Sequence, residues 1–329
     1  MASIPISTRI EAHPSLRPLN ILRDLPAVAD LIELCFSNTM DTEGQRYVQD
    51  MRRAGRDDGF LRWATKVAES TSLPLTGYVW EEDGRIVGNA SLVPFRQNGR
   101  RIYLIANVAV HPDFRRHGIA RALTGRALQH SRQHKVSAVW LHVRDDNPGA
   151  IQLYADLGFR EHARRTSWQA GGLQAASKLP GDLTVTTRLP RYWPQQQDWL
   201  RRLYPDELAW YHSWNFSALR PGLWNWFYLA FVDINVRQWA AVQRGQLEAT
   251  LAWIPAGRES NDLWLAASPK SSPEAITAVL NEARRVLSYQ PNVFLEYPAG
   301  EAVEAIQSAG FKPLRTLIWM EAPGATSPA

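Results

Sequence analysis

The chain has one cysteine, Cys35, among its 329 residues. A lone cysteine can form neither an intrachain disulfide nor a Cys-based zinc site, so a disulfide scaffold and a zinc finger are excluded. The eight histidines form no HExxH pair, and we expect no metal site. No apolar run approaches the roughly 18 residues of a membrane-spanning helix, and the first residues lack the apolar segment of a signal peptide. These absences predict a cytoplasmic protein without a membrane partner.

Acidic residues are only slightly outnumbered, with 37 Lys+Arg against 32 Asp+Glu and a net charge of +5. Such an excess is compatible with an anionic partner, but a genome that favours Arg codons produces it equally. The aromatic-rich stretch 210–228 carries one cation, Arg220, whereas surfaces that bind single-stranded nucleic acid combine aromatic side chains with many cations. We expect no nucleic-acid partner. The stretch is interpreted as core and inter-domain packing, with a substrate-pocket wall as the alternative.

Hydrophobic periodicity predicts alternating strands and helices over the first half of the chain. Asp83-Gly84 marks a hairpin tip, and Gly158 ends a short helix. The order predicts an α/β fold with a mixed sheet (α+β layering). The expected strands are 16–19, 76–81, 86–94, 103–110, 136–143 and 161–169, and the expected helices are 25–35, 118–134 and 149–157.

The second half repeats the first. Residues 150–159 align with 302–311 at a constant offset of 152, each segment ending in Gly-Phe, and Ile119 aligns with Ile276 further upstream. A strand, a helix and a Gly-Phe in the same order predict a duplication. Small residues, a Gly-Gly and a Pro-Gly pair place a linker at 171–182 between domains 1–170 and 183–329.

The segment Val110-His-Pro-Asp-Phe-Arg115-Arg-His-Gly118-Ile-Ala120 links an apolar strand directly to a helix. Small residues at 118 and 120 let a ligand approach the main chain. The first N–H groups of a helix have no intrahelical partner, and the helix dipole adds positive charge there. The sequence therefore predicts an anion cradle suited to a pyrophosphate.

This segment resembles the acetyl-CoA motif of the GNAT superfamily of N-acetyltransferases, V-x-P-x-x-[RQ]-x-x-G-x-[GA]. A second GNAT signature is matched by Asn147-Pro-Gly-Ala150-Ile-Gln-Leu153-Tyr154-Ala-Asp-Leu-Gly158-Phe159. Two motifs in the family's order make the resemblance specific. It covers about residues 16–170 directly and the remainder through the repeat, and it implies the acyl-CoA N-acyltransferase (GNAT) fold in two tandem copies.

The resemblance implies that acetyl-CoA enters a notch between two central strands that splay apart. Its pantetheine arm is expected on main-chain groups of Val108, Ala109 and Val110, and its pyrophosphate on Arg115, Arg116, His117, Gly118, Ile119 and Ala120. Asn147 is expected to bond the pantetheine or to hold the strand-to-helix loop. Tyr154 is expected to protonate the departing thiolate, and the alternative for it is packing at the base of the short helix.

No carboxylate occurs in residues 101–110, where many family members carry a glutamate base. His142, Glu81 and Glu82 are candidates by the proximity of their strands, and the base stays unassigned. The second half lacks the chemical residues: Ser272, Ala275 and Thr277 replace Arg115, Gly118 and Ala120, while Ile306 replaces Tyr154.

We therefore expect a catalytic first domain, a degenerate second domain that does not bind CoA, and transfer of acetyl from acetyl-CoA to a primary amine of a small molecule. The alternatives are a non-catalytic acyl-CoA-binding protein and a protein or peptide N-acetyltransferase. The sequence carries no signal for the acceptor's identity, the acyl-chain preference or an oligomeric state.

Overall fold

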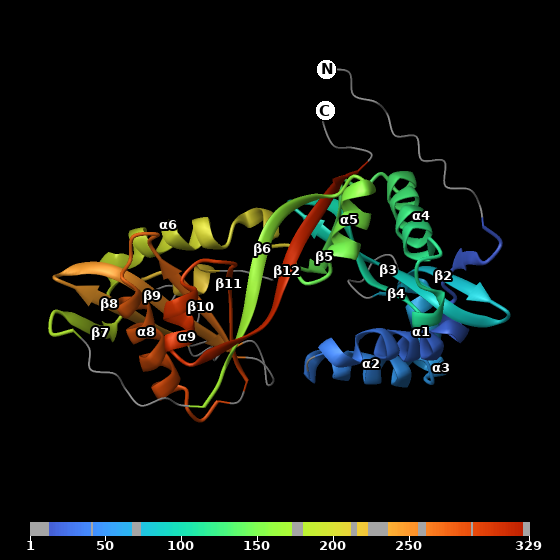
Figure 1. Ribbon diagram of the computed structural model, residues 1–329. Coiled ribbons are helices and arrows are strands. Elements are labelled where there is room, and N and C mark those ends of the chain that lie inside the picture. Colours follow the sequence, from blue (N-terminus) through green and yellow to red (C-terminus); the bar gives the residue numbers. More distant parts are fainter. Residues whose placement is uncertain are drawn as a thin grey trace, which may run out of the picture. The chain divides into compact units, whose positions relative to one another are not determined.

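The structure is a computed structural model that describes residues 13–40, 42–67, 74–172, 180–211, 216–222, 236–255, 261–290 and 292–324 (Figure 1). Its contacts define two compact units. Unit 1 is Met1–His162 with Trp319–Ala329, and unit 2 is Ala163–Ile318. The chain thus passes from one unit to the other twice. The domain limits 1–170 and 183–329 stay a prediction, and residues 173–179 of the expected linker lie outside the described residues.

The sheet of unit 1 has the strand order β1-β2-β3-β4-β5, followed by the end of β12. Neighbours from β1 to β4 are antiparallel, whereas β4 and β5 are parallel. Strands β1 to β5 agree with those expected from the alternation of apolar residues to within a few positions, whereas β12 was not predicted. Their bounds are β1 Leu16–Pro18, β2 Thr76–Glu82, β3 Arg85–Gln97, β4 Arg100–Val110, β5 Ala138–Arg144 and β12 Phe311–Pro323.

Helices cover both faces of this sheet. Helix α1 (Ile21–Phe36) begins at Asn20, whose side chain accepts from the Leu22 N–H, and packs with Val79 of β2 in one core cluster. Side chains alternate along a strand, so Gly88, opposite Trp80, faces the other way. On that face a Cβ at position 88 would lie 2.8 Å from the Ile119 side chain of α4. The close packing of α4 on the sheet therefore favours a glycine at this position. The remaining helices of unit 1 are α2 Thr42–Ala54, α3 Asp58–Val67, α4 Ile119–Gln133 and α5 Pro148–Asp156.

Strands β4 and β5 pair along only part of their length. The pairing runs from Ile102 opposite Ala138 to Ile105 opposite Leu141 and ends there, although both described strands continue. Just beyond this point β4 bulges: Ser91 pairs with Ala106 and Asn89 with Ala109, so two residues of β4 face one of β3. The expected separation of the two central strands is confirmed, and we call this region the notch.

Unit 2 repeats the element order of unit 1, which confirms the two tandem copies. Its sheet has the order β12-β6-β11-β10-β9-β8-β7, with β10 and β11 parallel. In this unit Thr166 of β6 and Thr316 of β12 are hydrogen-bonded at 2.9 Å. The elements are β6 Arg160–Ala170, β7 Leu183–Thr187, α6 Trp193–Leu203, β8 Arg237–Gln243, β9 Gln246–Pro255, β10 Asn261–Ala267, α8 Pro273–Val286, β11 Val293–Pro298 and α9 Val303–Ser308.

The aromatic-rich stretch 210–228 is described only at 210–211 and 216–222. In that part Phe216 lies 5.3 Å from Trp264 and 5.5 Å from Tyr204 between ring centroids, and Leu219 is fully buried. These residues pack into the core of unit 2. Trp210 and Tyr211 are also described, with ring centroids 5.7 Å apart. The remaining aromatic residues, Trp214, Trp224, Trp226, Phe227 and Tyr228, lie outside the described residues.

Candidate active site

The loop after β4 has the geometry of an anion cradle. A short 3-10 turn, Pro112–Phe114, follows β4, and Gly118 precedes α4 with a φ of 80°. The structure gives no main-chain acceptor to the N–H groups of residues 116–120, all of which lie in the described part of the chain. Apart from its chain neighbours, a Cβ on Gly118 would meet no atom within 4 Å, so the space beside this residue is open. Unpaired N–H groups at a helix start are a site for a phosphate or another anion.

Side chains around the loop add positive charge. Arg115, Arg116 and His117 are exposed, whereas Ile119 is buried and offers the site only its main chain. The Arg115 Nε donates to the Val110 carbonyl at 3.2 Å, and the Cys35 thiol of α1 lies 3.3 Å from the same oxygen. Burial raises the pKa of that thiol. The loop and α1 are therefore joined at the end of β4.

The bulge of β4 is held by a buried polar cluster. Asn89 is 0% exposed, and its Nδ2 donates to the Asn107 carbonyl at 2.9 Å. Asn107 has a φ of 53°, and its own Nδ2 donates to the Tyr47 hydroxyl at 2.7 Å. Burial raises the pKa of Tyr47 to about 12. The cluster holds the main chain at Val108 and Val110, both partly exposed, in place along the notch.

The second motif forms α5 and the loop before it. Asn147 caps the helix, since its Oδ1 accepts from the Ala150 N–H at 3.1 Å. Tyr154 is 7% exposed, with its ring 6.1 Å from that of Phe159. Burial raises the pKa of Tyr154 to about 12. Its hydroxyl therefore stays protonated at neutral pH.

Two of the three candidate bases are engaged elsewhere. Glu81 forms ion pairs with Arg17 and Arg23, and Glu82 accepts from the Trp80 indole at 2.7 Å. His142 follows Leu141, where β5 leaves β4, and its ring lies 4.1 Å from that of Trp319. The described residues hold no group of three His, Cys, Asp or Glu side chains that could bind a metal ion.

The corresponding region of unit 2 is filled by its own side chains. Here β10 and β11 pair only as far as Leu263 opposite Leu295. Beyond that point the buried Tyr204 hydroxyl lies 3.2 Å from the Leu265 carbonyl and 3.3 Å from the Glu296 carbonyl, one on each strand. At the start of α8 the Ser272 hydroxyl accepts from the Ala275 N–H. Both the strand edges and the helix start are thus occupied from within the chain.

Comparison with known proteins agrees with this geometry. Residues 27–159 match the family model described as the acetyltransferase (GNAT) family. This stretch contains the notch, the cradle and Tyr154. This part of the chain belongs to the GNAT superfamily.

The names of the GNAT relatives refer to different molecules. One is an E. coli K12 "[Ribosomal protein bS18]-alanine N-acetyltransferase", 40% identical over 62 residues, or 19% of this chain and 42% of the relative. Another is a "Mycothiol acetyltransferase" of Saccharomonospora viridis, 33% identical over 117 residues, or 36% of each chain. The matched parts therefore span less than half of either relative.

A solved structure shares the fold over nearly the whole GNAT chain. It is a GCN5-related N-acetyltransferase from Sphaerobacter thermophilus, with a TM-score of 0.54 and 16% identity, covering 95% of this chain and 98% of that one. At that identity the likeness concerns the fold alone. It extends across both tandem copies of the GNAT fold.

Sequence reasoning missed three polar residues of this GNAT protein: Tyr47, Asn89 and Tyr204. Asn89 had a signal, because it interrupts an expected strand whose positions 87–94 are all buried. A polar residue in such a run indicates a hydrogen-bonding role. No sequence signal pointed to Tyr47 or Tyr204, because tertiary structure determines their contacts.

Proposed function

We propose that this protein transfers an acetyl group from acetyl-CoA to a primary amine of a small molecule, in the notch of unit 1. The row of open N–H groups at residues 116–120 carries the proposal. Its place beside the separated ends of β4 and β5 supports a ligand with an anionic end and an extended arm, as acetyl-CoA has. The arm pairs with the main chain at Val108–Val110, and the pyrophosphate lies on the cradle with Arg115 and Arg116 nearby.

The reaction needs few protein groups. The amine nitrogen attacks the thioester carbonyl carbon and the C–S bond breaks. The nitrogen loses a proton to solvent, and the thiolate takes one. The Tyr154 hydroxyl, which is protonated at neutral pH, supplies the proton for the thiolate and regains one from solvent. Asn147 acts by fixing the start of α5, and with it the position of Tyr154. The rest of the rate enhancement comes from holding the two reactants together.

The acceptor amine has to arrive uncharged. Position 107 holds an asparagine bonded to Tyr47, and Glu81 is engaged in ion pairs. Of the three candidate bases His142 remains, and as long as no base is assigned we take the amine to react only as its free form. We therefore expect log kcat/KM to rise with pH and to level off at the pKa of the acceptor.

Two acceptors whose amines differ by about 2 pKa units test this expectation through their pH profiles. The midpoint of the profile should move by the same amount as the amine pKa. A midpoint that stays at one pH for both amines reveals a base on the enzyme and contradicts the expectation.

A protein or peptide acceptor is the second candidate, favoured by the ribosomal-protein acetyltransferase among the relatives. Release of free CoA, measured against a panel of small amines and of peptides with free N-termini, separates the two. Small amines should give the higher kcat/KM. Release of CoA with peptides alone would assign the protein or peptide acceptor. Binding of acetyl-CoA without release of CoA with any acceptor would contradict both proposed activities.

Unit 2 should take no acetyl-CoA, because Tyr204 bonds to both of its strand edges and Ser272 caps its α8. We expect calorimetry to give one acetyl-CoA per chain. Two equivalents per chain would refute the assignment of the site to unit 1 alone.

A further inference from the structure

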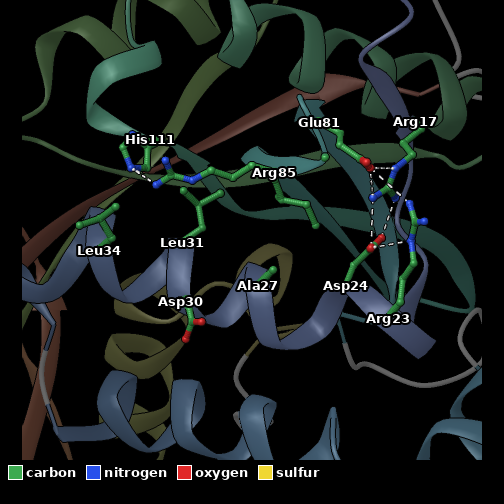
Figure 2. A pocket seen from close by; sticks show the side chains of 12 residues that line it. Arg17, Arg23, Asp24, Ala27, Asp30, Leu31, Leu34, Glu81, Arg85 and His111 are labelled. Carbon is green, nitrogen blue, oxygen red and sulfur yellow. Dashed lines mark hydrogen bonds and ion pairs between the residues drawn. The ribbon is translucent and has the colours of Figure 1, made fainter.

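Unit 1 has a second concave region, separate from the notch. It is a pocket of about 570 Å³ between α1 and the β2–β3 hairpin (Figure 2). The notch lies on the β5 side of β4, whereas this pocket lies on the β3 side, where the His111 N–H donates to the Val87 carbonyl at 2.8 Å. Its lining includes Ala27, Leu31 and Leu34 of α1, together with Arg85, Ile86 and His111.

Most charges around the pocket neutralise one another. Asp24 is 3% exposed and accepts from Arg17 and Arg23, which also pair with Glu81. Asp30 pairs with Arg52 at 2.7 Å. The two carboxylates beside Arg17 balance the two arginines, so this end of the pocket is close to neutral.

Arg85 is the exception. Figure 2 shows its side chain extending past Leu31 toward His111, and one guanidinium nitrogen lies 2.7 Å from the His111 Nε2. In the described part of the chain no carboxylate forms an ion pair with Arg85. A guanidinium has five N–H donors in a planar fork that fits a carboxylate, and one imidazole nitrogen uses a single donor.

An apolar wall stands beside this cation. Ala27, Leu31 and Leu34 follow one another at helical spacing along α1, and Ile86 faces them from the hairpin. Leu34 is 50% exposed although it borders the pocket. A pocket in the size range of ligand sites thus combines a guanidinium that has no carboxylate partner in the described part of the chain with aliphatic side chains.

We propose that this pocket binds a small organic carboxylate with an apolar body. The carboxylate is bound by Arg85, and the body packs against Leu31, Leu34 and Ile86. A phosphate-bearing or polyanionic ligand fits less well, because Asp24, Asp30 and Glu81 lie around the same pocket.

Binding of a ligand in the pocket should also affect the loop after β4. His111 is the first residue of that loop, and its carbonyl accepts from the Phe114 N–H at 2.9 Å. The His111 ring also contacts the loop, since its Nδ1 accepts from the Asp113 N–H at 3.3 Å. A ligand that draws Arg85 from His111 changes the contacts of this ring, so the carboxylate and acetyl-CoA should alter each other's affinity by the same factor. This second step rests on the proposed function, whereas the binding site itself does not.

The test is calorimetry on the full chain without acetyl-CoA, using hexanoate and phenylacetate as probes and their uncharged amides as controls. The carboxylates should bind at least tenfold tighter than the amides. Arg85→Gln should abolish that preference, because it removes the guanidinium fork. Arg53→Gln, which removes an exposed arginine of α2, should leave it unchanged.

Ala27→Trp provides a steric variant at an exposed helix position, and it should weaken both carboxylates by filling the pocket. Equal binding of carboxylates and amides, or equal affinity in the Arg85 and Arg53 variants, overturns the site. A carboxylate that binds through Arg85 without changing the Kd of acetyl-CoA overturns the coupling. Absence of acetyl-CoA binding in any condition counts against the notch and leaves the Arg85 result standing.

Discussion

Gly118→Val should lower the affinity for acetyl-CoA by at least 100-fold. The glycine has a φ of 80°, and apart from its chain neighbours nothing lies within 4 Å of the position that a Cβ would take. A valine there would fill the open space beside this residue of the cradle. It would also strain the backbone, because β-branched residues avoid positive φ. Calorimetric titration with acetyl-CoA measures the loss.

A matched glycine separates the loss of the ligand site from backbone strain. Gly99, in the β3–β4 turn, has a φ of 76° and equally open surroundings, but it lies outside the cradle. Gly99→Val should therefore cost a similar amount of stability, about 1–3 kcal/mol, and keep wild-type affinity. Thermal unfolding of both variants checks the strain. Unchanged affinity in Gly118→Val would mean that the pyrophosphate binds elsewhere.

Tyr154→Phe should lower kcat by roughly 100-fold and leave the Kd of acetyl-CoA nearly unchanged. The substitution removes only the hydroxyl, and the ring keeps its contact with Phe159. Because burial raises the pKa of Tyr154 to about 12, the wild-type hydroxyl carries its proton throughout the working pH range. Single-turnover kinetics with a good acceptor isolates the chemical step.

The control for this variant is a buried tyrosine of the other unit. Tyr192 is 8% exposed against 7% for Tyr154, so Tyr192→Phe removes a hydroxyl from a side chain of similar burial, and there it also removes a hydrogen bond from Arg191. It should leave kcat unaltered. If Tyr154→Phe turns over as fast as wild type, the thiolate takes its proton from water and Tyr154 is a packing residue.

The strands of unit 1 could be predicted because apolar residues alternate or run continuously at 76–110 and 136–143, and β2 to β5 confirm them. Helices α2 and α3 could not. In the 13 residues of α2 the apolar side chains are Tyr47, Val48, Met51 and the terminal Ala54, too few to stand out from a polar loop. The helix forms because Val48 and Met51 complete a core that α1 begins.

For the site, the cradle at Gly118 and the helix at Tyr154 were predictable because each motif encodes its own local backbone. The contact of Asn89 with Asn107 and that of Tyr204 with Glu296 could not be predicted, because each joins residues far apart in the sequence. The assignment of β6 to one unit and of the end of β12 to the other was also beyond reach. Only the first of these segments was expected as a strand, at 161–169, and periodicity does not say which sheet a strand joins.

That exchange of final strands affects the order in which the protein folds during synthesis. Unit 1 is completed by Trp319–Pro323 of β12, next to β5, and the Gly324 N–H donates to the Ser137 carbonyl at 3.1 Å. The ribosome makes these residues only after it has made the whole of unit 2. The first half of the nascent chain therefore waits with an open edge at β5, exposed to wrong pairing, until translation has almost finished. Unit 1, although most of it is translated first, can therefore complete its sheet only after unit 2 has been synthesised.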